Sequence, residues 1–190
     1  MIAPPGHIII SPIGDIDSEL VEQISLEIRR MFGYEIKVIS LLKNVTFALD
    51  AGRGQYHSTP ILEELAKSAP PETLKVLAIV DLDLFIPILT HVYGEAQLGG
   101  KASIISTYRL KEGLSAIGAA ESYRYRVLKE SVHELGHTFN LRHCKDHACI
   151  MHYCHSVKDV DRKSNQLCRY CKIMLRDEIK RLEKGLSPAK

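Results

Sequence analysis

Side chains that bind metal ions are concentrated in one short segment of the sequence. The stretch VHELGHTFNLRHC, residues 132–144, contains His133, Glu134, His137, His143 and Cys144. Imidazole nitrogens, carboxylate oxygens and thiolates are the usual protein ligands of zinc. The segment therefore predicts metal chemistry, and the first question is whether these side chains serve one ion or two.

The first part of this segment belongs to a predicted long helix. We expect the helix to run from about Ala119 to Phe139, because this stretch lacks proline and is rich in helix formers. His133 and His137 are four residues apart, so their side chains project from one face and can reach one ion. Glu134 is turned by about 100° from His133, which suits a base that hydrogen-bonds a metal-bound water. The alternative is a surface helix with two solvated histidines.

A third ligand can come from the chain just beyond this helix. Asn140 stands where a left-handed residue would end the helix, and asparagine tolerates positive φ well. The chain can then reverse and bring His143 to the same ion. Three nitrogen ligands leave the fourth tetrahedral position open, as catalytic zinc requires. The predicted ligands of a catalytic zinc are therefore His133, His137 and His143, with Glu134 as the general base.

The five cysteines all lie between Cys144 and Cys171. An odd number of cysteines in a chain without an export signal favours metal binding over a disulfide framework. The spacing of Cys144 from Cys149, and of Cys168 from Cys171, suits a four-thiolate structural zinc site with no position open for substrate. This second zinc would clamp the segment after His143 onto a C-terminal helix; the alternative is a set of unconnected buried thiols. Three apolar residues mark that helix by their spacing: Leu175, Ile179 and Leu182.

These motifs resemble those of a known peptidase clan. HELGHTFNLRH is similar to the metzincin zinc signature H-E-x-x-H-x-x-G-x-x-H, with Asn140 in place of the usual glycine, and Met151 falls where the Met-turn of that clan would lie. HCKDHACIM followed by CRYC narrows the resemblance to the archaemetzincins, a metzincin family with a second, cysteine-bound zinc. The resemblance implies a two-zinc metallopeptidase in which Met151 forms a hydrophobic base under the catalytic ion without coordinating it.

Tyr153 follows Met151 in the order Met-His-Tyr, which resembles the Met-turn of the astacins. There the tyrosine lies near the zinc and can stabilise the transition state, so Tyr153 is a candidate donor to the oxyanion. The alternative is a tyrosine packed beneath the active-site helix. Cys154 remains as a packed or free thiol. We expect the remaining loop histidines to be solvated or to support the ligands: His147, His152 and His155.

The chain upstream of the metal-binding segment alternates predicted strands and helices. Strands are expected over residues 7–14, 34–42 and 73–85, and helices over residues 18–33 and 58–71. The first helix would begin at Asp15 or Asp17 and end at Gly33. The second would take Ser58 or Thr59 as its N-cap, with Pro60 in its first position.

A hairpin or edge strand is expected over residues 93–110, around Gly99 and Gly100, and the part near GGKASIIST could pair with an extended peptide. The order of elements predicts an α+β fold with an α/β-like first part: a metzincin-like mixed twisted sheet with packed helices, a long active-site helix and a zinc-clamped C-terminal segment ending in a helix. We expect residues 1–190 to form one catalytic domain, with the sheet and helices in residues 1–140 and the four-cysteine site in residues 141–190.

Composition limits the classes of function. The 190 residues are 45% hydrophobic and 25% charged, with a formal net charge of +2, which gives no electrostatic case for binding nucleic acid or membranes. The sequence contains no apolar run long enough to cross a bilayer, and its N-terminus lacks the features of a signal peptide. We expect a cytoplasmic monomer that acts on a peptide or protein substrate.

The function expected from these features is a zinc-dependent metallopeptidase with two zinc ions, one catalytic and one structural. Glu134 would take a proton from the zinc-bound water and pass it to the leaving amine. One alternative is a non-catalytic zinc-binding interaction module with a vestigial active site, which would not need Glu134. A nucleic-acid-binding zinc protein is a second alternative, which would need a basic stripe that the sequence does not supply.

Overall fold

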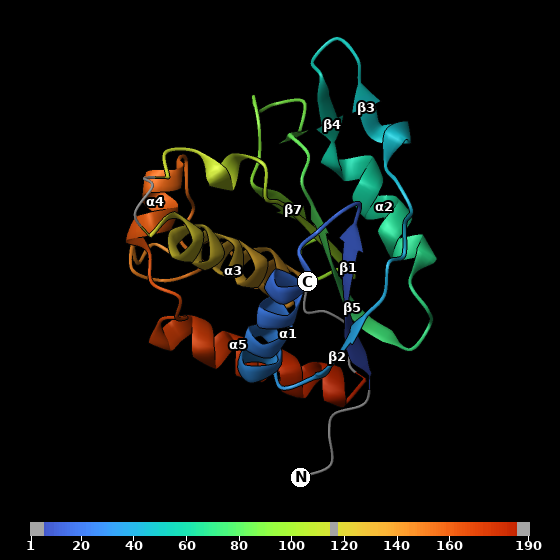
Figure 1. Cartoon of the computed structure of the whole chain (residues 1–190). Coiled ribbons are helices and arrows are strands. Elements are labelled where there is room, and N and C mark those ends of the chain that lie inside the picture. The colour runs from blue at the N-terminus through green and yellow to red at the C-terminus, as the bar shows by residue number, and fades with distance from the viewer. Residues whose placement is uncertain (1–5, 115–117, 186–190) are drawn as a thin grey trace.

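The computed structural model describes residues 6–114 and 118–185. Its larger sheet has five strands in the order β2-β1-β5-β8-β7 (Figure 1). Strands β1 (His7–Ile13), β2 (Glu35–Val38), β5 (Thr73–Val80) and β8 (Ala102–Ser106) run parallel, and β7 (Gly94–Ala96) pairs antiparallel with β8. The predicted mixed sheet with packed helices is confirmed, and the fold is α+β.

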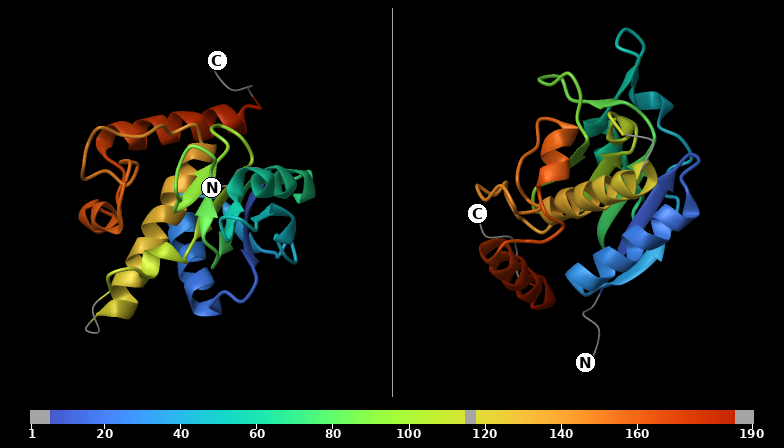
Figure 2. Two further views of the ribbon diagram at one scale, coloured as in Figure 1. Left: turned by 90° about the horizontal axis from the view of Figure 1, so that it is seen from above. Right: turned by 60° about the vertical axis from the view of Figure 1, so that its left-hand side comes forward.

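The central strands are buried and mostly apolar because both faces of the sheet are covered. Along β1, Ile8 and Ile10 belong to the core on the side of α1 (Ser18–Phe32) and α3 (Ala119–Thr138), whereas Ile9 belongs to the core on the side of α2 (Ser58–Ser68). Figures 1 and 2 show α3 and α1 on one face of the sheet and α2 on the other.

The first helix begins and ends as the sequence indicates. The Asp17 carboxylate accepts a hydrogen bond from the Glu19 backbone N–H at 3.0 Å, so Asp17 and not Asp15 is the N-cap of α1. Gly33 follows the helix in the left-handed region, with φ of 80°. Burial of the apolar stripe of α1 against the sheet then fixes the helix: Leu20, Val21, Ile24, Ile28 and Phe32.

The predicted start of α2 is wrong. His57 is the N-cap, and Ser58 is the first residue of the helix, so Pro60 lies in the third position. The hydroxyl groups of Ser58 and Thr59 are not free to cap the helix because both donate to the carboxylate of Glu95 in β7. This contact fastens the edge strand to the start of α2.

The predicted strand over residues 73–85 is divided in the structure. β5 ends at Val80, and the chain resumes as β6 (Leu84–Phe85), which belongs to a second, three-stranded sheet with β3 (Leu49–Asp50) and β4 (Gln55–His57). Two aspartates between these strands form salt bridges: Asp81 with Lys111 at 2.6 Å and Asp83 with Arg109 at 2.6 Å.

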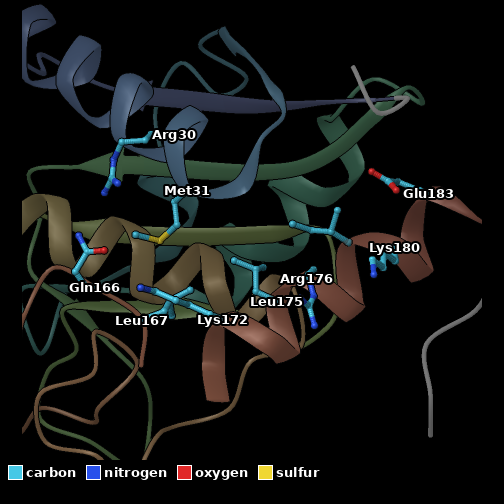
Figure 3. A pocket seen from close by; sticks show the side chains of 10 residues that line it. Arg30, Met31, Gln166, Leu167, Lys172, Leu175, Arg176, Lys180 and Glu183 are labelled. Carbon is cyan, nitrogen blue, oxygen red and sulfur yellow. The ribbon is translucent and has the colours of Figure 1, made fainter. Parts of the chain in front are cut away.

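The C-terminal part contains two further helices. α4 (Val157–Arg162) was not expected, although Ser156 and Asp159 form a capping box at its start. α5 (Arg169–Glu183) is the predicted C-terminal helix and buries Leu175. A hollow between α1 and α5 is lined by Arg30 and Met31 on one side and by Leu175 and Ile179 on the other, and it contains none of the predicted site residues (Figure 3).

Candidate metal centres and active site

Helix α3 places His133 and His137 side by side, one helical turn apart. The His133 Nδ1–H donates to the Ile150 carbonyl at 2.9 Å, and the His137 Nδ1–H donates to the Leu141 carbonyl at 2.7 Å. Because a carbonyl oxygen only accepts, the proton of each ring is on Nδ1. The two Nε2 atoms are 3.2 Å apart and keep their lone pairs for a shared cation.

The turn after α3 brings the third histidine to this pair. Asn140 has the expected left-handed conformation, with φ of 62°, and the Asn140 and Gly99 N–H groups both donate to the His137 carbonyl at 2.9 Å. The chain reverses, and the His143 ring lies 5.3 Å from that of His133 and 4.8 Å from that of His137, measured between centroids. The three imidazoles offer ligand nitrogens that all lie within 4.8 Å of one another.

The electrostatics of the three rings suit a metal cation. Burial lowers the pKa of His133 well below its usual value, and burial together with the neighbouring His137 lowers the pKa of His143 to about 4. The pKa of His137 is lowered by burial as well. All three imidazoles are therefore neutral near pH 7, which is the form that binds zinc, and the donor set fits one zinc ion.

Glu134 lies beside this cluster and lines the same cleft as the three histidines. Its side chain is buried, and this burial, reinforced by the charge of Glu130, raises the pKa of the carboxyl well above its usual range. A buried carboxylate with a strong affinity for a proton is the property required of a general base.

Strand β7 approaches Glu134 more closely than a side chain would permit. A Cβ atom added at Gly94 would lie 2.5 Å from Glu134 Cγ and 2.6 Å from the Ile104 carbonyl oxygen. Only glycine lets the edge strand lie this close to the Glu134 side chain. This contact joins residues 40 positions apart (94 to 134) and could not be read from the sequence.

A buried ion pair lies behind the cluster. Lys163 Nζ is 2.7 Å from Glu130 Oε1, and both side chains are buried. Lys163 Nζ also lies 3.4 Å from His133 Nδ1. Neither residue was predicted from the sequence to belong to the site. The only available signal was that Glu130 precedes Glu134 by four residues and therefore shares its face of the helix.

Met151 is fully buried against α3. A Cβ atom at Gly136 would lie 2.7 Å from the Met151 sulfur, so the absence of a side chain at Gly136 makes room for this methionine directly before His137. The structure thus places Met151 against the helix that carries the histidines, as the resemblance to metzincins implies.

Tyr153 forms part of the cleft wall. Its ring centroid is 4.9 Å from that of His143, and the residue is 38% exposed. The alternative of a tyrosine packed beneath α3 is therefore wrong. His155 packs edge-on against Tyr153, at 4.6 Å between ring centroids. Cys154 is half-buried, and burial raises the pKa of its thiol to about 11, so this cysteine is a neutral thiol.

The other four cysteines come together as predicted. The sulfur atoms of Cys144, Cys149, Cys168 and Cys171 all lie within 4.8 Å of one another. The Cys168 N–H donates to Cys149 Sγ at 3.3 Å, and the Cys171 N–H donates to Cys168 Sγ at 3.5 Å. Hydrogen bonds of this kind orient thiolates toward a shared ion, and four sulfur donors in this arrangement fit a tetrahedral zinc. The reading as unconnected thiols is wrong.

The four-cysteine cluster connects the segment after His143 to the C-terminal helix α5. Cys168 is the N-cap of α5, whereas Cys144 directly follows His143. The segment before α5 is also held by backbone bonds, since the Ile150 N–H donates to the Gln166 carbonyl at 2.9 Å. The border between the two donor sets lies between His143 and Cys144.

The cleft above the histidines runs along β7 and is lined also by residues from segment 86–93. The expected edge strand near GGKASIIST is wrong, because β8 lies between β5 and β7. The edge is instead β7, the other arm of the predicted hairpin. Among residues 6–114 and 118–185, no helix combines the length and apolar character needed to span a bilayer.

Comparison with known proteins identifies relatives over most of the chain. The model of peptidase family M54 matches residues 21–177. The archaemetzincin of Archaeoglobus fulgidus is 37% identical over 170 residues, covering 89% of this chain and 98% of that protein. The archaemetzincin of Halobacterium salinarum is 35% identical over 166 residues, covering 85% and 95% of the two chains.

Solved structures agree with this assignment. The crystal structure of the Archaeoglobus fulgidus archaemetzincin complexed with malonate superposes with a TM-score of 0.76 at 36% identity, covering 88% of this chain and 99% of that one. The structure of the Methanopyrus kandleri archaemetzincin gives a TM-score of 0.78 at 32% identity, covering 93% and 97%. With its histidine and cysteine sets, the chain belongs to peptidase family M54, the archaemetzincins, and is a zinc metallopeptidase.

Proposed function

We propose that the chain hydrolyses peptide bonds with Glu134 as the general base beside a zinc ion held by His133, His137 and His143. The observation that carries this proposal is the convergence of three neutral imidazoles next to one buried carboxyl group. Zinc, when bound there, polarises the substrate carbonyl and lowers the pKa of water to near neutrality. We also propose that Cys144, Cys149, Cys168 and Cys171 hold a second, structural zinc.

Glu134 performs two proton transfers in this proposal. Its carboxylate accepts a proton from the attacking water, which becomes the nucleophile at the scissile carbonyl carbon. The resulting carboxylic acid then gives the proton to the leaving amine as the C–N bond breaks. Burial of Glu134 supports both steps, because the raised pKa makes the carboxylate a strong base and limits exchange of the proton with solvent.

Strand β7 supplies a surface for the substrate backbone. It is the last strand on its side of the five-stranded sheet, and the cleft with the histidines runs beside it. An extended peptide that paired with Gly94–Ala96 would be held beside Glu134 by backbone hydrogen bonds. Because Gly94 has no side chain, the strand that would pair with the peptide itself lies close to Glu134.

The decisive experiment compares two single variants with the wild type. Glu134→Gln keeps the shape of the side chain but cannot accept the proton. We expect it to retain zinc and lose at least about 100-fold in kcat, the size typical of a general base. His133→Ala should lose the catalytic zinc as well as activity. Full cleavage of a peptide library by zinc-loaded Glu134→Gln would refute the proposed role. Absence of chelator-sensitive cleavage by the wild type would favour the non-catalytic zinc-binding module.

A further inference from the structure

Two histidines that belong to neither donor set face each other. His147 lies in the loop between Cys144 and Met151, and His152 directly follows Met151. His147 Nδ1 lies 3.0 Å from His152 Nε2, and the ring centroids are 4.4 Å apart. His147 is exposed and His152 is half-buried. The pair therefore lies at the surface, where ions from solution can reach it.

The hydrogen bond on the far side of His152 fixes which nitrogen is free. The His152 Nδ1–H donates to the Cys144 carbonyl at 2.8 Å, so the lone pair of a neutral ring is on Nε2 and faces His147. His133 and His137 show the same pattern, with Nδ1–H bound to a carbonyl and Nε2 facing a second imidazole at 3.2 Å. Orientation by a backbone carbonyl is typical of histidines that bind metal.

We propose that His147 and His152 form a third, exchangeable metal site for a transition-metal dication such as Zn²⁺. Nitrogen ligands bind such ions at about 2.0–2.1 Å. In the tetrahedral shell typical of zinc, two such nitrogens are about 3.3 Å apart, which is close to the observed separation of 3.0 Å. Water molecules complete the coordination shell at this exposed position.

The ligand chemistry determines which ions bind and how tightly. Two imidazoles favour zinc, copper and nickel over magnesium and calcium, which prefer oxygen ligands. With only two protein ligands, the ion binds more weakly than in the three-histidine or four-cysteine sets. The charge of the bound ion lies near the catalytic set, because Tyr153, the residue directly after His152, packs against His143 with ring centroids 4.9 Å apart.

Calorimetric titration of the metal-loaded protein with Zn²⁺ tests this proposal. The protein is first saturated with zinc, freed of loosely held ions by gel filtration and analysed for metal content. We expect the wild type to bind one more Zn²⁺ per chain than the His147→Ala variant, with an affinity at least tenfold below that of the retained ions. Because the result is a difference between two proteins, it does not depend on how many ions the other sites retain.

Two controls separate this site from general histidine binding. His147→Ala removes an exposed side chain whose one described partner is His152, so the fold and the retained ions should be unchanged. His91→Ala removes a histidine from the segment before β7 and should keep the extra ion. Mg²⁺ should not bind in place of Zn²⁺. An equal uptake of Zn²⁺ by the wild type and His147→Ala would overturn the proposal and leave a simple hydrogen bond between the two rings.

Discussion

Gly94 and Glu134 are in contact in a way that only glycine permits. A Cβ atom at residue 94 would lie 2.5 Å from Cγ of Glu134, well inside the contact distance of two carbon atoms. The backbone of Gly94 is not in the left-handed region, so the glycine is required here for space and not for conformational freedom. The edge strand thus sets the position of the proposed base.

Substitution of this glycine should impair catalysis more than metal binding. We expect Gly94→Ala to displace Glu134 and to lower kcat by about 10- to 100-fold, since a shift of about 1 Å in a catalytic group has effects of this size. Zinc content should stay at the wild-type level because the three histidines are not touched. Steady-state kinetics and metal analysis of the purified variant measure both quantities.

Gly52→Ala is the matched control for this substitution. Gly52 also lies outside the left-handed region, and an added Cβ would meet only the Asp50 carboxylate, at 3.3 Å. The Gly52→Ala variant should have the activity of the wild type. Because the Gly94 substitution also approaches the Ile104 carbonyl, thermal unfolding is followed in parallel. A folded, zinc-loaded Gly94→Ala protein with wild-type kcat would show that Glu134 is not positioned by this contact.

Removal of the Tyr153 hydroxyl should lower turnover. The ring lies against His143 at the cleft wall, where a phenol can donate to the oxyanion as charge develops. We expect Tyr153→Phe to lower kcat with little change in KM. Unchanged kcat in a stable, zinc-loaded Phe variant would assign Tyr153 to the cleft wall alone.

Metal removal should distinguish the two donor sets. We expect a chelator to take the ion from the histidine set first, because His143 is exposed and the set keeps a position open to solvent. The four-thiolate ion should leave only with loss of structure, since it joins the chain after His143 to α5. Metal content and circular dichroism recorded along a chelator titration measure the order of loss.

Single substitutions in the two sets should separate their effects on stability. Cys168→Ser removes a thiolate from the N-cap of α5, and we expect it to lower Tm more than His133→Ala does. Equal Tm changes in the two variants would contradict a structural role for the thiolate set. The zinc content of each variant shows which ion has been lost.

Lys75 should make the stability of the protein depend on pH. Its Nζ donates to the Thr138 and Gly100 carbonyls at 2.6 and 2.7 Å, and burial lowers its pKa from the usual 10.5 to about 8. Between about pH 8 and pH 10.5 the Lys75 side chain is protonated in the unfolded chain and neutral in the folded chain. The contribution of Lys75 to the free energy of unfolding therefore rises with pH in this range. The full gain is on the order of 3 kcal/mol.

Lys75→Met isolates this contribution from other titrating groups. We expect the difference in free energy of unfolding between the wild type and this variant to grow in favour of the wild type from pH 7.5 to pH 10. Urea unfolding of the zinc-loaded proteins at a series of pH values measures it. A difference that stays constant with pH would mean that the pKa of Lys75 is close to its usual value in the folded state.

Local features were predictable from the sequence, because their physical causes are local. The positions of His133 and His137 follow from helical periodicity, and the reversal at Asn140 follows from the conformational preference of asparagine. The paired spacing of the cysteines likewise indicated one cluster. That these residues bind two zinc ions stays a prediction, which the chelator titration tests.

Contacts between distant segments were not predictable. The bonds of Lys75 to the end of α3 span 63 residues, and the contact of Lys163 with His133 spans 30. No periodicity links such pairs. The N-cap of α2 was missed for the same reason, because Ser58 and Thr59 are taken up by Glu95, 37 and 36 residues away. The edge strand was assigned to the wrong arm of the hairpin because strand order depends on pairing with β5.

The Ile150 carbonyl that orients His133 belongs to the residue directly after Cys149. One peptide unit therefore connects the thiolate cluster to the carbonyl that orients the histidine ring. With both proposed zinc ions bound, occupancy of the two sites would be thermodynamically linked, and each ion would raise the affinity for the other by the same factor. Oxidation of a cluster thiol would weaken the hold on the catalytic ion, so the peptidase would respond to oxidants through groups that never meet the substrate.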